Sequence, residues 1–79
     1  MQNETEMKFA VSHLVGDEET ILRLFGPEQK QQALCFARAV VKDYDRGLVC
    51  VFTAVFRAGT MERVDDGLRL YDGFRCGKS

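Results

Sequence analysis

The run LVCVFTAVF, residues 48–56, predicts a β-strand that is apolar on both faces. Eight of its nine residues are apolar, many are β-branched or aromatic, and none is charged. Side chains in a strand point alternately to opposite faces, so even-numbered positions form one face and odd-numbered positions the other. Both faces need burial, by a folded-over segment, a ligand or a partner. The pattern leaves open which face meets a helix.

Two shorter segments precede this run. Residues 8–15, KFAVSHLV, alternate between apolar and polar and predict a strand, and residues 16–19, GDEE, predict a turn. Residues 20–25, TILRLF, form either a second strand that closes a hairpin or a short helix. We prefer the hairpin, because six residues are short for a helix and typical of a strand.

A helix is predicted between Pro27 and Gly47. Pro27 suits a first helical position, where its missing N–H costs nothing. Gly47 is placed to end the helix as a left-handed cap. The apolar residues between them form one stripe at helical spacing, which consists of Ala33, Leu34, Ala37, Val40, Val41 and Tyr44.

The C-terminal part predicts one further strand and hints at another. Turn signals at residues 58–60 and 65–67 bracket residues 61–64, a candidate short fifth strand. Residues 68–75, LRLYDGFR, alternate and predict the last strand. Its inward residues are Leu68, Leu70 and Phe74. Its outward residues are Arg69, Tyr71 and Arg75.

The order of elements is therefore β-β-α-β-β, an α+β domain with a four-stranded antiparallel sheet and one helix packed on one face. The domain is predicted to cover residues 7–75, with disordered tails at residues 1–6 and 76–79. A right-handed connection through the helix predicts the strand order 2-1-3-4, which places residues 48–56 centrally.

Composition narrows the class of protein. Hydrophobic residues at 46% and charged residues at 29% are typical of soluble globular domains, and a net charge of -1 argues against non-specific nucleic-acid binding. Three cysteines without a CxxC spacing indicate reduced thiols. No membrane span or signal peptide is visible, so we expect a cytoplasmic protein.

No catalytic, cofactor-binding or metal-binding signature is present. Residues 77–79, GKS, imitate the end of a phosphate-binding loop, but Asp72 stands where its first glycine should be. A pair of Cys50 and His13 could act as a thiol nucleophile and its base. Burial would raise the pKa of that thiol and not activate it, so a packed cysteine and a structural histidine are the favoured interpretation.

Three functional hypotheses follow. The first is a non-catalytic interaction module that forms a homodimer or binds a partner protein through the sheet face opposite the helix, using Val49, Val51, Val55, Ile21 and Phe25. The second is a nucleic-acid-binding regulator that uses the outward residues Arg69, Tyr71 and Arg75. The third is an enzyme that uses Cys50 and His13.

Overall fold

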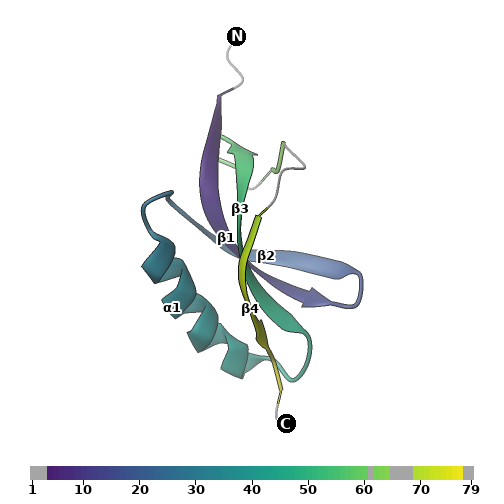
Figure 1. Ribbon diagram of the computed structural model, residues 1–79. Coiled ribbons are helices and arrows are strands. Elements are labelled where there is room, and N and C mark those ends of the chain that lie inside the picture. The colour runs from purple at the N-terminus through teal and green to yellow at the C-terminus, as the bar shows by residue number, and fades with distance from the viewer. Residues whose placement is uncertain (1–3, 61, 65–68, 78–79) are drawn as a thin grey trace.

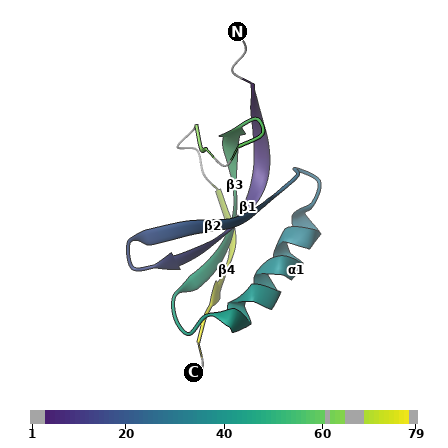
Figure 2. The ribbon, with the colours of Figure 1, turned by 180° about the vertical axis from the view of Figure 1, so that it is seen from behind.

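The computed structural model describes residues 4–60, 62–64 and 69–77, with the side chains of 69–71 left aside. Its elements are β1 (Thr5–Val15), β2 (Glu18–Phe25), α1 (Lys30–Val40), the 3₁₀ turn η1 (Val41–Asp43), β3 (Leu48–Arg57) and β4 (Arg69–Arg75). Figures 1 and 2 show α1 lying along one side of the sheet. The predicted α+β architecture is confirmed.

The four strands form one antiparallel sheet in the order β2-β1-β3-β4, as predicted. The apolar strand β3 is central and pairs with β1 from Leu48 to Arg57. Its other edge pairs with β4 from Leu48 to Thr53. This position satisfies the backbone of β3 on both edges and leaves only its two faces to be covered.

The strand interpretation of residues 20–25 is also confirmed. β1 and β2 are joined by a turn at Gly16 and Asp17, where Gly16 has φ of +60°. A glycine with positive φ at the first turn position is typical of the tight turns that connect twisted hairpin strands. In the views of Figures 1 and 2, this hairpin swings away from the rest of the sheet.

The helix is shorter than predicted at both ends. It begins at Lys30 because the preceding residues form a turn, in which the N–H of Gln29 donates to the Gly26 carbonyl at 3.0 Å. After Val40 it tightens into η1 and ends before Tyr44, which is extended. Gly47 is therefore not the helix cap. It has φ of +94°, and a Cβ there would lie 2.5 Å from the Leu14 carbonyl oxygen.

Three residues outside the predicted domain take part in elements or contacts of the fold. Thr5 and Glu6 belong to β1, which reaches three residues further than predicted and pairs there with β3. Cys76 is buried, and its N–H donates to the Gly47 carbonyl at 2.9 Å. The candidate fifth strand is reduced to a single bridge between Arg63 and Phe56, and its residue 61 lies outside the described residues, as does Leu68 of the predicted last strand.

Each face of the sheet has its own buried cluster. The helix-side cluster consists of Phe9, Val11, Phe25, Ala33, Ala37, Val49, Val51 and Cys76. The cluster on the opposite face consists of Ala10, Phe52, Ala54 and Phe56, and it contains no helix residue. The odd-numbered positions of β3 therefore face the helix. The buried helix residues in this cluster are two alanines.

This arrangement corrects part of the predicted partner surface. Val49, Val51 and Phe25 were expected on the face opposite the helix, but they lie in the helix-side cluster with at most 8% of their surface exposed. Residues so deeply buried are unable to contact a partner, so their role is in the core.

A charge at Val51 tests this assignment. Val51→Glu would bury an unpaired carboxylate, and we expect it to lower the free energy of unfolding by about 3 kcal/mol or more. Leu48→Glu is the matched control, because it lies in the same strand with 38% of its surface exposed. Urea denaturation followed by circular dichroism measures both, and a Val51→Glu midpoint equal to that of Leu48→Glu would contradict the assignment.

Candidate interaction surfaces

The face turned away from α1, which we call the open face, is built of cross-strand rows. Residues directly opposite each other in neighbouring strands point to the same face. The first row runs from β2 to β4 through Glu19, Leu14, Leu48 and Arg75. The second runs through Ile21, Ser12, Cys50 and Gly73. The third runs through Leu24, Ala10 and Phe52.

Apolar side chains on the open face remain accessible. Leu48 is exposed, and four further apolar side chains are half-buried, namely Leu14, Ile21, Leu24 and Cys50. Between them Ala10 and Ser12 form a floor of small buried residues. Gly73 closes the second row without a side chain, and a Cβ built there would have no atom of the described residues within 4 Å, its chain neighbours aside. The face is therefore apolar, with an open space at its β4 end.

An ion pair lies across the inner part of this face. The Arg63 guanidinium contacts Glu19 Oε1 at 3.2 Å and lies 4.9 Å from the centre of the Phe52 ring. The other carboxylate oxygen, Oε2, accepts a hydrogen bond from the buried Ser12 hydroxyl at 2.9 Å. The segment that follows β3 thus folds back and supplies one cover for Phe52, with both charges neutralised.

The two remaining apolar residues of the predicted partner surface lie far apart. Ile21 lies on the open face, whereas Val55 pairs with Met7 on the helix-side face. Met7 is 55% exposed, the highest value among the large hydrophobic side chains described. The predicted set is therefore divided between the core and two different surfaces.

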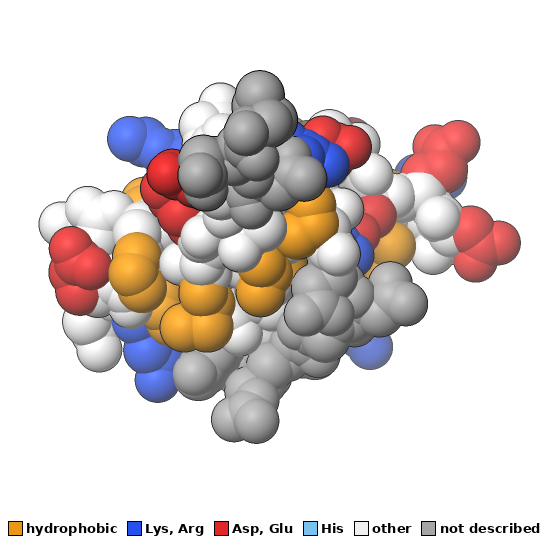
Figure 3. Space-filling view, turned by 90° about the horizontal axis from the view of Figure 1, so that it is seen from above, with side chains coloured by type: hydrophobic (Ala, Val, Ile, Leu, Met, Phe, Trp, Pro, Cys, Tyr) orange, Lys and Arg blue, Asp and Glu red, His pale blue; other side chains and the backbone are white. Residues whose placement is uncertain are grey.

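The area around Met7 and Val55 lies where β1 and β3 extend beyond the helix. Val64 borders it, with its N–H donating to the Val55 carbonyl at 3.0 Å. Figure 3 views this end of the molecule and shows a band of hydrophobic side chains, with acidic side chains gathered at the far right. Within β1, the Glu6 carboxylate and the Lys8 ammonium form an ion pair at 3.2 Å.

The predicted Arg69, Tyr71 and Arg75 surface depends on regular alternation along β4, and that alternation is interrupted. Arg69 pairs with Thr53 and Arg75 pairs with Leu48, with an irregularity in the register between them. Thr53 and Leu48 are five residues apart, so these positions belong to opposite faces of the sheet. The side chains of Arg69 and Tyr71 lie outside the described residues, and Arg75 is exposed.

His13 and Cys50 do not meet. Cys50 pairs with Ser12, and His13 pairs with Val49, so the two side chains point to opposite faces. The Nε2–H of His13 donates to the Arg46 carbonyl at 2.9 Å, and its ring stacks on Tyr44 with 3.7 Å between centroids. These contacts give His13 a structural role in holding the loop before β3.

The environment of Cys50 also weakens it as a nucleophile. Burial raises the pKa of its thiol, and the nearby Glu19 and Cys76 raise it further. Burial likewise raises the pKa of the Cys76 thiol. A raised pKa reduces the fraction of thiolate at neutral pH, and the thiolate is the reactive form.

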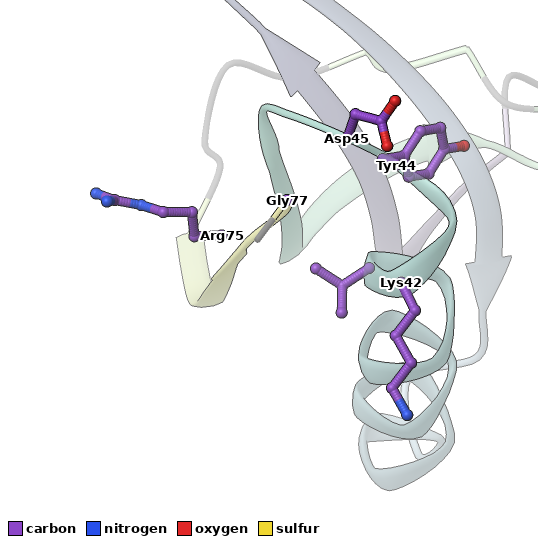
Figure 4. Close-up of a pocket in the computed structure, with 6 residues that line it drawn as sticks. Lys42, Tyr44, Asp45, Arg75 and Gly77 are labelled. Atoms are coloured by element: carbon purple, nitrogen blue, oxygen red, sulfur yellow. The ribbon is translucent and has the colours of Figure 1, made fainter. Parts of the chain in front are cut away.

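A cleft of about 490 Å³ lies at the C-terminal end of the helix. It is lined by Val41, Lys42, Tyr44, Asp45, Arg75 and Gly77. Figure 4 shows the Lys42 and Arg75 side chains extending away from each other, so the two cations do not converge on one point in the cleft. The geometry does not define a site for an anion.

Among the described residues, no group of three or more histidine, cysteine or acidic side chains is placed to hold a metal ion. None of the described helices has the length and apolarity needed to cross a membrane.

No protein-family model matches this chain, and no curated protein or solved structure does.

The thiol environments predict an order of alkylation. At pH 7.5 iodoacetamide should modify the exposed Cys35 first, with Cys50 and Cys76 at least about tenfold slower. Raising the pH to 9 should accelerate Cys50 and Cys76 because more of each thiol ionises. Peptide mass spectrometry measures the rates, with urea-unfolded protein as the control. Equal rates for Cys50 and Cys35 at pH 7.5 would contradict the buried environment.

Proposed function

We propose that this chain is a non-catalytic protein-interaction module that binds a protein surface through its open face. The observation that carries the proposal is the group of five apolar side chains left wholly or partly exposed on that face. Contiguous apolar surface of this kind is typical of interaction sites, whereas apolar residues exposed singly are common in any protein.

The charge of the open face favours a protein partner over nucleic acid. Glu19 and Arg63 neutralise each other, and Arg75 is the remaining described cation of the three rows. The neighbouring hairpin turn carries Asp17 and Glu18, which would repel phosphates. Binding through this face would therefore depend on shape and apolar contact more than on counterion release.

The state of the nucleophiles supports a non-catalytic role. The Cys50 thiol is partly desolvated beside a carboxylate, and the His13 ring is held by a carbonyl and by Tyr44. The three cysteines are free thiols, which fits the reducing cytoplasm that we propose as the compartment.

Site-specific photo-crosslinking in the producing cells tests the proposal. A benzoylphenylalanine at position 48 should give a crosslinked species of defined mass, because Leu48 is the most exposed apolar residue of the open face. The control is the same residue at position 35, which is exposed on the helix and faces away from the sheet.

The crosslink supports the proposal only if Ile21→Glu, which places a charge in the same face, reduces it at least about fivefold. Absence of a crosslink at position 48, or equal crosslinking at position 35, would overturn the proposal.

A further inference from the structure

We propose that the partner on the open face is a second copy of this chain, packed open face to open face around a two-fold axis that runs along the strands. This inference rests on the proposed function and names the partner of the same face. A symmetric interface requires a surface that is complementary to itself. The rows of the open face have this property.

The second row provides a complementary shape. A two-fold axis along the strands reverses the order of the strands, so β4 of the second copy lies over β2 of the first. Ile21 stands at the β2 end of the row and Gly73 at the β4 end. Ile21 of each copy therefore meets Gly73 of the other, where no described atom outside the adjacent residues lies within 4 Å of a Cβ position. The side chain enters the space that the glycine leaves open, and symmetry makes this contact twice.

The first row provides complementary charge. Glu19 stands at the β2 end of the row, where Arg63 of its own chain already neutralises it. The adjoining hairpin carries the exposed Asp17 and Glu18. Arg75 stands at the β4 end, so the same axis places each acidic hairpin opposite a basic end. Arg75 makes no ion pair within the described part of the chain. Leu14 and Leu48 lie between the two charges and meet each other across the axis. The row thus combines apolar contact at its centre with opposite charges at its rim, as in other specific interfaces.

The size of the face predicts a reversible dimer. Four strands are about 19 Å wide, and three rows extend about 20 Å along them, which gives about 400 Å² per copy. This is small beside the roughly 800 Å² per partner of a standard interface, and small interfaces form weak or transient complexes. We therefore expect association to depend on concentration in the micromolar range.

Sedimentation velocity of the purified chain from about 5 to 500 µM tests the inference. The mass should rise from 9.0 kDa toward twice that value. Gly73→Val fills the space that Ile21 enters, and we expect it to weaken association at least tenfold. The variant should fold, because an added Cβ meets no described atom beyond the neighbouring residues within 4 Å and strands favour β-branched residues. Circular dichroism checks the fold.

The control is Asp72→Val, which places the same side chain at the neighbouring, exposed position on the other face of β4. It also removes the hydrogen bond that the Gly73 N–H donates to Asp72 Oδ1 at 2.9 Å, so circular dichroism checks the fold of this variant too. Asp72→Val should leave association unchanged. Arg75→Glu should weaken association about tenfold at low salt and less at high salt, because it replaces each attraction at the rim with a repulsion.

The outcomes separate this inference from the proposed function. One outcome is a mass of 9.0 kDa at every concentration together with a position-48 crosslink to a protein of another size. It would overturn the proposal that the partner is a second copy and would leave the proposed interaction role intact. A dimer that Gly73→Val does not weaken, or that Asp72→Val weakens equally, would overturn this geometry. A monomer without any crosslink would overturn both.

Discussion

The structure depends on one constraint, which is that the central strand β3 must bury an apolar surface on each of its two faces. Pairing with β1 and β4 satisfies its backbone but covers neither face. The single helix covers one face, where Ala33 and Ala37 let it approach closely enough to seal Val49 and Val51 completely. Burial of each large apolar side chain is worth about 2 kcal/mol, so this layer accounts for much of the stability. The second face is left to shorter segments of the chain.

The covering of the second face is uneven along the strands. Where β3 ends, Phe56 and Phe52 are fully buried, and Arg63 packs its guanidinium over the Phe52 ring. The interaction of a cation with an aromatic face, anchored by Glu19, lets a charged segment cover an apolar side chain. Where β3 begins, Leu48 is exposed and Gly73 of β4 contributes no side chain. Because the open face is covered near the end of β3 and not at its beginning, the solvent-accessible apolar surface lies around the beginning of β3.

The sequence predicted the elements and their order because these follow from local patterns, namely alternation, helical spacing and the position of glycines and proline. It did not predict which face of β3 meets the helix, because an apolar run is compatible with either choice. It also did not reveal the register irregularities beside Ser12 and Phe52, which change the face that later residues occupy. Two predicted groupings, Arg69 with Arg75 and His13 with Cys50, depend on how neighbouring strands align. A local sequence pattern does not specify this alignment. Gly47 was recognised as a special position, but its close approach to Leu14 is a tertiary contact.

The open face carries apolar side chains at Leu14 and Leu48, where the described chain leaves them accessible. A sheet face that only meets water usually carries polar side chains, as at Glu6 and Lys8 in β1. The continuation of that face places Leu14 beside Leu48, although neither is sealed by the described chain. Polar residues at these two positions would preserve the sheet, because strand pairing does not depend on their side chains. The helix-side core gains nothing from them either, since it lies on the other side of the backbone. In the proposed interaction, a second surface removes these two side chains from water, which favours apolar residues over polar ones at both positions.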